Sequence, residues 1–158
     1  MDAIPFILFG CVCLGAFVLV YLADRQRAAA IRAFATRSGF HYIGDALPRS
    51  VTLRGTPLEG VSKVWNVIDG EPRGVRIVAF DCRIGMGKGS WRRTVIAVED
   101  ATYLLLAPSF NSELTIDTAG NWKILYRPKA SVNFRIAGLM PVAELESYLG
   151  SFAPNTPQ

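Results

Sequence analysis

The amino-acid sequence predicts an α+β fold, in which an N-terminal transmembrane helix precedes a small antiparallel sheet that a C-terminal helix closes. Three observations support this prediction. Ile4 to Ala23 is a run of twenty residues without a charge, short β-branched runs separated by glycine and proline begin at Gly39, and the apolar period becomes helical after Pro141. The chain of 158 residues is long enough for one domain with its own core behind the first helix.

The first segment, residues 1–23, is expected to cross a membrane. Twenty residues at about 1.5 Å each match a bilayer core of roughly 30 Å, and twelve of the twenty are Ile, Leu, Val or Phe. A cleaved signal peptide is the alternative, and it would require a positively charged start. Only Met1, Asp2 and Ala3 precede the apolar run, so the sequence favours a true membrane span.

Positive charge lies on one side of this segment. No Lys or Arg precedes it, and four membrane-proximal arginines follow it: Arg25, Arg27, Arg32 and Arg37. This asymmetry predicts a single-pass protein of the bacterial inner membrane, with the N-terminus outside and the C-terminal domain in the cytoplasm. The formal charge of +4, with its positive groups beside the span, indicates contact with anionic lipid headgroups and not with nucleic acid.

Residues 24–38 are expected to form a basic juxtamembrane helix that continues from the span. Ile31 and Phe34 share one helical face and should pack on the domain, with arginines at the headgroups, and Gly39 stands where the helix should end.

Residues 39–153 are predicted to form a cytoplasmic α+β domain, followed by a disordered tail at 154–158. The expected strands are FHYIG (40–44), SVTLRG (50–55), VSKVWNVI (61–68), VRIVAFDCRI (75–84), SWRRTVIAVE (90–99), TYLLLA (102–107), SELTID (112–117), NWKILYR (121–127) and SVNFRIAG (131–138). The helix follows Pro141, with Val142, Leu145, Tyr148 and Leu149 on one face. By analogy, a strongly bent sheet or partly open barrel of the pleckstrin-homology type fits this pattern.

The stretch FDCRIGMGKGSWRRTV, residues 80–95, superficially resembles a phosphate-binding loop. A Walker A loop requires Gly-Lys followed by Ser or Thr and then a helix, but Gly87-Lys88 is followed by Gly89 and by an alternating, β-branched segment. The stretch therefore predicts a hairpin with a glycine-rich tip. Strict alternation places Val78, Phe80 and Cys82 on one face of its first strand, and Ile77, Ala79 and Asp81 on the other.

Basic residues gather on this hairpin and on the turn before it. They are Arg73, Arg76, Arg83, Lys88, Arg92 and Arg93. Two interpretations remain open: a solvated basic tip, or a site that binds lipid headgroups or an acidic protein partner.

Residues for catalysis or metal binding are scarce, and we expect no enzyme activity, no metal and no cofactor. His41 is the one histidine, and Cys82 is the one cysteine outside the span. Asp81 interrupts an apolar strand, and pairing with an arginine or a backbone N–H is favoured over catalysis. The tryptophans and tyrosines lie in apolar strands, where core packing explains them better than stacking on nucleic acid.

The hairpin region, Asn66 to Val95, resembles a group of uncharacterised bacterial membrane-anchored proteins. In these proteins a membrane segment and a helix precede a G-[FL]-x-[FY] strand start. An N-V-[IL]-x-G turn, a G-x-x-V-x-x-F-D strand and a glycine-lysine hairpin that ends in T-V then follow. The matching residues here are Gly39, Phe40, Tyr42, Asn66, Val67, Ile68, Gly70, Gly74, Val75 or Val78, Phe80, Asp81, Gly87, Lys88, Thr94 and Val95. The resemblance covers about half the chain and implies no activity, because none is established for the group.

The sequence thus favours a membrane protein that presents a non-enzymatic binding domain to the cytoplasm, in contact with anionic lipid through the basic hairpin. A protein-interaction subunit of a larger membrane complex is the alternative. An enzyme with its site around Asp81 ranks third.

Overall fold

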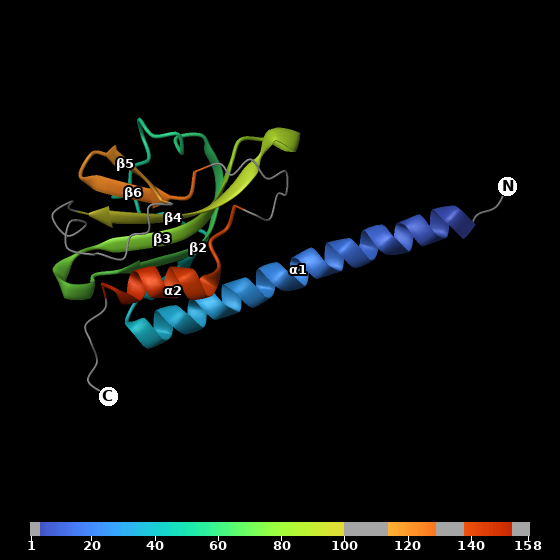
Figure 1. Ribbon diagram of the computed structural model, residues 1–158, viewed down its shortest axis with the longest axis horizontal. Helices are drawn as coiled ribbons and strands as arrows, with labels where there is room; N and C mark the ends of the chain where they lie inside the picture. The colour runs from blue at the N-terminus through green and yellow to red at the C-terminus, as the bar shows by residue number, and fades with distance from the viewer. Residues whose placement is uncertain (1–3, 100–113, 129–137, 153–158) are drawn as a thin grey trace.

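The computed structural model describes residues 4–99, 114–128 and 138–152 and confirms the α+β class (Figure 1). Its helices are α1 (Ile4–Ser38) and α2 (Val142–Gly150). Its strands are β1 (His41–Gly44), β2 (Val61–Gly70), β3 (Ile77–Ile84), β4 (Trp91–Glu99), β5 (Thr115–Ala119) and β6 (Trp122–Tyr126). Short 3₁₀ turns, η1 (Pro72–Gly74) and η2 (Gly87–Gly89), lie in the β2–β3 and β3–β4 connections.

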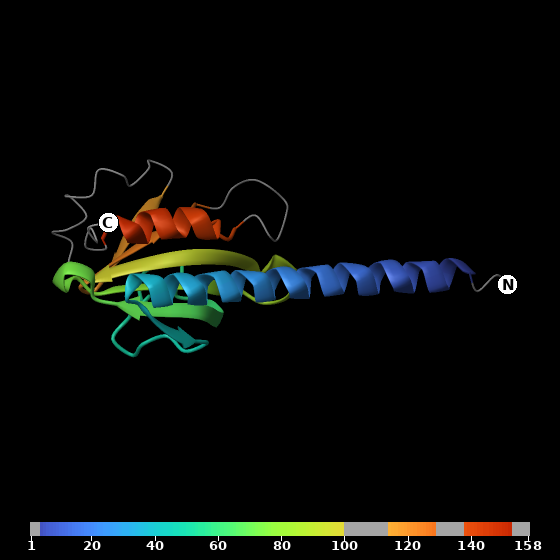
Figure 2. The ribbon, with the colours of Figure 1, turned by 90° about the horizontal axis from the view of Figure 1, so that it is seen from below.

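The six strands form one open antiparallel sheet in the order β1-β2-β3-β4-β6-β5. The predicted hairpin is its centre, because β3 and β4 pair along their whole length, from Ile77 opposite Val98 to Ile84 opposite Trp91. The hairpin tip extends from the sheet on the side toward the N-terminal half of α1 (Figures 1 and 2).

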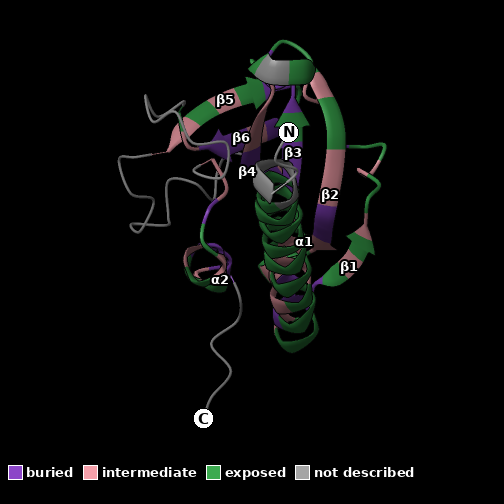
Figure 3. Ribbon diagram, turned by 90° about the vertical axis from the view of Figure 1, so that its right-hand side faces the viewer, coloured by how far each residue is buried: buried purple, intermediate pink, exposed green. Residues whose placement is uncertain are grey.

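Helix α1 is continuous over 35 residues, which corresponds to about 52 Å. Its N-terminal half projects beyond the domain, with residues 8–23 exposed, whereas its C-terminal half lies along the sheet (Figures 1 and 3). The helix ends where the sequence predicts, since Gly39 has φ 75° and the Phe40 N–H donates to the Ala35 carbonyl at 2.9 Å. Phe40 also stacks on Phe34 at 5.9 Å between ring centroids, which completes a C-terminal cap of the Schellman type.

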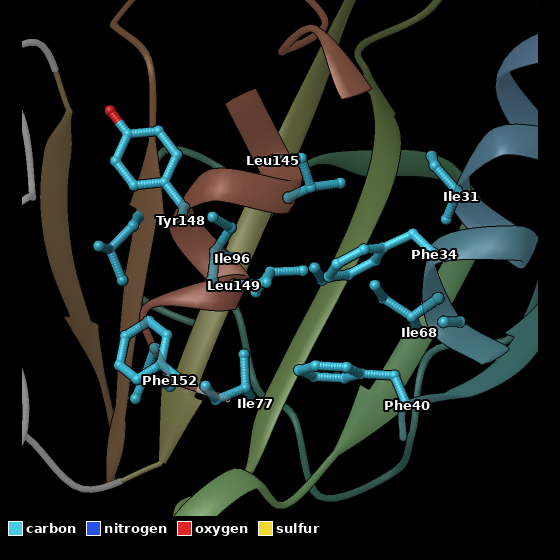
Figure 4. Close-up of a cluster of buried hydrophobic side chains, with 14 of the residues drawn as sticks. Ile31, Phe34, Phe40, Ile68, Ile77, Ile96, Leu145, Tyr148, Leu149 and Phe152 are labelled. Atoms are coloured by element: carbon cyan, nitrogen blue, oxygen red, sulfur yellow. The ribbon is translucent and has the colours of Figure 1, made fainter. Parts of the chain in front are cut away.

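The predicted alternation in β3 is confirmed, and it separates two apolar cores. On one face, Ile77 and Ala79 pack beneath both helices, with Ile31 and Phe34 from α1 and Leu149 from α2 (Figure 4). On the other face, Val78, Phe80 and Cys82 contribute to a second core that includes Val51, Leu58 and Trp122. The expected packing of the juxtamembrane helix on the domain is therefore confirmed.

The predicted strand SVTLRG (50–55) is wrong. This segment forms turns, in which Val51 N–H donates to the Pro48 carbonyl at 3.0 Å and Thr56 N–H to the Leu53 carbonyl at 3.2 Å. The indole N–H of Trp122 donates to the Ser50 carbonyl at 2.9 Å. Hydrogen bonds within turns and from a side chain thus take the place of the interstrand hydrogen bonds that a strand would make. The apolar residues of the segment still cover the second core.

The structure bears out some of the other predicted elements. The strand expected at 112–117 occurs as β5, Thr115–Ala119, and the apolar face of the last helix is confirmed by buried Leu145, Tyr148 and Leu149. The strand expected at 102–107 and the tail at 154–158 lie outside the described residues, and so does the strand expected at 131–138 except for Gly138, which lies in a turn.

Candidate functional site

A buried ionic cluster joins α1 to the centre of the sheet. The Asp81 side chain is 1% exposed and forms a side-on pair with Arg27, with Nε–Oδ2 at 2.7 Å and Nη2–Oδ1 at 2.8 Å. Asn66 Nδ2 donates to Oδ2 at 2.9 Å, and the Thr94 hydroxyl donates to Oδ1 at 2.7 Å. Asp81 thus accepts four hydrogen bonds, about the full capacity of a carboxylate.

Local backbone geometry brings the two neutral partners to Asp81. Thr94 lies directly opposite it in the β3–β4 ladder. Asn66 occupies an irregularity in β2, where the register shifts between Trp65 and Ile68, and it has a positive φ of 53°. Asn is among the residues that best tolerate this conformation, and its Oδ1 accepts a 3.2 Å hydrogen bond from the Tyr42 hydroxyl.

Arg27 connects three parts of the chain. Its Nη1 donates to the Met140 carbonyl at 2.7 Å, just before α2, and its Nη2 donates to the Thr94 hydroxyl at 2.9 Å. The Met140 N–H in turn donates to the Thr94 hydroxyl at 2.9 Å. We refer to Arg27, Asn66, Asp81 and Thr94, with the Met140 backbone, as the buried ionic cluster.

The sequence predicted that Asp81 would pair with an arginine or a backbone N–H, and the first form is observed. The partner is 54 residues away in α1, so no local pattern identifies it. Arg27 was expected at the lipid headgroups, but its side chain is 13% exposed and lies in the cluster.

The other three arginines that follow the apolar segment in α1 have different surroundings. Arg25 lies over the Tyr21 ring at 5.7 Å, near the end of the apolar segment. Arg32 lies over the Tyr42 ring at 4.7 Å. Arg37 lies in the last turn of α1 and pairs with Glu146 at 3.2 Å on the surface. Arg25 is thus the arginine nearest the apolar segment, and it does not belong to the buried ionic cluster.

Arg92 and Arg93, the second and third residues of β4, both make contacts inside the molecule. Arg92 pairs with Asp24 of α1 at 2.8 Å and lies over the Trp65 ring at 4.9 Å. Arg93 is 3% exposed and packs between the Trp91 and Tyr126 rings, at 4.1 and 5.6 Å. Burial lowers the pKa of Arg93.

The tip of the β3–β4 hairpin holds the remaining basic positions. Arg83 is exposed near the end of β3, and Lys88 lies within η2. Between them, Met86 is 88% exposed.

Arg73 and Arg76 lie at the opposite end of β3, before its first residue, and so belong to a different surface. Arg76 pairs with Asp69 at 2.8 Å, and this hydrogen-bonded contact raises its pKa. The structure therefore divides the six candidate residues: Arg83, Lys88, Arg92 and Arg93 lie on the tip half of the hairpin, and Arg73 and Arg76 lie at its far end.

Among the described residues, His41 and Cys82 lie apart, on the strands β1 and β3, which are not neighbours in the sheet. His41 is exposed on the edge strand β1. Cys82 is buried, and desolvation, aided by the charge of Asp81, raises the pKa of its thiol to about 12. Within residues 4–99, 114–128 and 138–152, no three His, Cys, Asp or Glu side chains gather as metal ligands would.

No family model, curated protein or solved structure matches this chain.

Proposed function

We propose that the protein is a single-pass protein of the bacterial inner membrane that holds a non-enzymatic binding domain against the cytoplasmic face in a fixed orientation. The observation that carries this proposal is the dual character of α1. One unbroken helix has an exposed apolar half and a half that belongs to the core of the domain.

The exposed half supports the membrane assignment. α1 is long and apolar enough to cross a bilayer, and in the described structure no part of the domain covers residues 8–23. Leaving large side chains such as Phe9 (71% exposed) and Phe17 (70% exposed) in water is costly, and lipid removes that cost. Tyr21 with Arg25 then suits the interfacial belt of aromatic and basic residues.

The packed half supports a fixed orientation. Asp24 pairs with Arg92 and Arg27 with Asp81, so contacts with the sheet begin at the first charged residue after the apolar segment. A flexible linker has no place there, and the domain turns only as far as α1 turns. Whether the sheet curves into a pleckstrin-homology-type barrel remains a prediction.

Anionic lipid is the first candidate ligand. Arg25 at the end of the span and Arg83 and Lys88 at the hairpin tip supply positive charge. Such residues contribute about 1 kcal/mol each near an anionic surface, and salt weakens the contribution.

A protein-interaction subunit of a larger membrane complex is the second candidate. Ile43 and Ile116 are 42% and 49% exposed on the two edge strands, β1 and β5. Edge strands with exposed apolar side chains suit the addition of a strand from a partner. The enzyme hypothesis has less support, because the hydrogen bonds to Asp81 occupy both of its carboxylate oxygens.

Hydrogen–deuterium exchange of the full chain in nanodiscs tests the lipid proposal. With anionic lipid at low salt, we expect slower exchange of the hairpin amides than with neutral lipid, and loss of the difference at high salt. The substitution Arg83→Ala should reduce the difference, whereas the control Arg73→Ala, at the far end of β3, should not. Equal exchange in both lipids would reject lipid contact and favour the protein-interaction alternative.

The membrane assignment has its own test. The full chain expressed in bacteria should resist carbonate extraction from membranes, and a fluorescent protein fused after Gln158 should fold and fluoresce in the cytoplasm. Extraction by carbonate, or a reporter active only outside the cytoplasm, would contradict the proposed topology.

A further inference from the structure

Met86 is the most exposed of the large apolar side chains in the described part of the chain, at 88%. Outside α1, two others are exposed there, Ile43 and Ile116, and both lie on edge strands. Met86 instead stands alone at the turn of the central hairpin, among glycines and basic residues. An isolated apolar side chain of this kind at a basic tip has the composition of a surface that enters a lipid interface.

Contacts with α1 show which way the hairpin points. Asp81 meets Arg27, and two residues further along the hairpin, Arg92 (opposite Arg83) meets Asp24. The hairpin therefore advances toward the N-terminus of α1 as it approaches its tip. Because a strand residue advances about 3.3 Å and a helical residue about 1.5 Å, residues beyond Arg83 lie level with the last apolar turns of α1. Figures 1 and 2 both show the tip on the side of the domain from which the apolar half of α1 projects.

The tip is built to hold Met86 outward. Gly85 and Gly87, on either side of it, have φ values of 76° and 63°, which L side chains rarely adopt. The Ser62 hydroxyl contacts the carbonyls of Gly85 and Arg83 at 2.9 and 3.3 Å, and Gly85 N–H donates to the Gly60 carbonyl at 3.3 Å. On the other side, the Ser90 hydroxyl donates to the Gly87 carbonyl at 2.9 Å. The turn thus has a defined shape that β2 supports from below.

We propose that the β3–β4 hairpin is a second point of membrane contact, at which Met86 enters the boundary between headgroups and acyl chains while Arg83 faces the phosphates. This inference rests on the proposed membrane span. With α1 as the first contact, the hairpin limits how far the domain can tilt relative to the membrane plane.

Depth-dependent fluorescence quenching on the full chain in vesicles tests this inference. In a Cys11→Ser/Cys13→Ser background, an environment-sensitive dye is attached to a single new thiol, from Met86→Cys, Leu14→Cys or Thr118→Cys; Cys82 is buried and should stay unlabelled. Leu14 reports the span. Thr118, exposed on β5 opposite Lys123 and so at the end of the sheet away from the tip, is the matched control.

We expect lipids brominated on their acyl chains to quench most of the emission from position 14, to quench the emission from position 86, and to leave the emission from position 118 unchanged. In vesicles of unbrominated lipid, the emission from position 86 should be blue-shifted, because the dye there lies in less polar surroundings. Quenching at 14 without quenching at 86 would overturn the hairpin inference and leave the proposed span intact. A dye at 86 that is shielded from aqueous iodide but not quenched by lipid would also overturn it, in favour of contact with protein. Absence of quenching at 14 would refute the span and the inference together.

Discussion

The guanidinium of Arg27 and the carboxylate of Asp81 meet side-on, at 2.7 and 2.8 Å, between a helix that begins in an apolar segment and the middle of a sheet. This pair makes the C-terminal half of α1 part of the domain. Asn66 and Thr94, which hydrogen-bond to Asp81, are also buried. Loss of one member of the cluster therefore leaves buried polar groups of the other members without hydrogen-bond partners.

Removal of one charge from this pair should destabilise the domain. Arg27→Ala leaves the Asp81 carboxylate buried without its counter-ion, and the free energy of unfolding should fall by about 3–5 kcal/mol. Thermal or denaturant unfolding in detergent micelles, followed by near-UV circular dichroism, measures it. The control is Arg37→Ala, whose exposed pair with Glu146 should change stability by less than about 1 kcal/mol.

The double variant Arg27→Met/Asp81→Leu separates charge from packing. Replacing both partners with apolar side chains removes the buried charge, so this variant should be more stable than Arg27→Ala alone. A double variant as unstable as the single one would mean that the surrounding hydrogen bonds, and not the unpaired carboxylate, account for the loss.

Truncation should separate the two halves of α1. A fragment of residues 24–158 keeps Arg27, Ile31 and Phe34 and should unfold cooperatively, because the core and the buried ionic cluster are retained. A fragment of residues 39–158 lacks these side chains and should bind hydrophobic dyes and lose cooperativity. Cooperative unfolding of the shorter fragment would show that α1 is a passive anchor.

Alkaline pH should destabilise the domain. Desolvation raises the pKa of Cys82 to about 12 from its ordinary value of 9.0, and that of Tyr126 to about 12 from 10.0, the latter also through a hydrogen bond to Asp117. Both groups ionise more easily in the unfolded chain, so their contribution is present below about pH 9 and is lost as pH rises toward about 12. Denaturant unfolding across that range should show a falling free energy, and Tyr126→Phe should make the decline shallower. A parallel decline in that variant would exclude Tyr126 as a cause.

Arg93 should tolerate loss of its charge better than loss of its volume. Its guanidinium packs between Trp91 and Tyr126, and its buried Nε has no hydrogen-bond partner among the described residues. Arg93→Met keeps most of the volume and removes a desolvated charge, so its stability should stay within about 1 kcal/mol of the parent, whereas Arg93→Ala opens a cavity and should cost about 2 kcal/mol or more. If Met proved as damaging as Ala, the cation–π contacts would have to carry the stability of this site.

Gly138 should not accept a side chain. A Cβ there would lie 1.9 Å from the Arg92 carbonyl oxygen, and backbone cannot yield as a flexible side chain does. We expect Gly138→Ala to lower the melting temperature by several degrees, since overpacking typically costs about 1–3 kcal/mol. Gly89→Ala, with nothing within 4 Å, is the control and should leave the melting temperature nearly unchanged.

The sequence alone determined those features that depend on local pattern. The length of the apolar run, the stop at Gly39, the alternation in β3 and the apolar face of α2 were predictable because each is set by a period or by the backbone freedom of glycine within a few residues. The turns at 50–55 were not, since a β-branched segment can cover a core without joining its sheet.

The tertiary structure alone decided the roles of the charged residues. Charge counts along the chain treat Arg25 and Arg27, or Arg83 and Arg92, as equivalent. In the fold, Arg27 and Arg92 pair with Asp81 and Asp24, which lie 54 and 68 residues away, while Arg25 and Arg83 remain exposed. Ion pairs between distant segments depend on how a helix packs on a sheet, and that geometry has no local signal in the sequence.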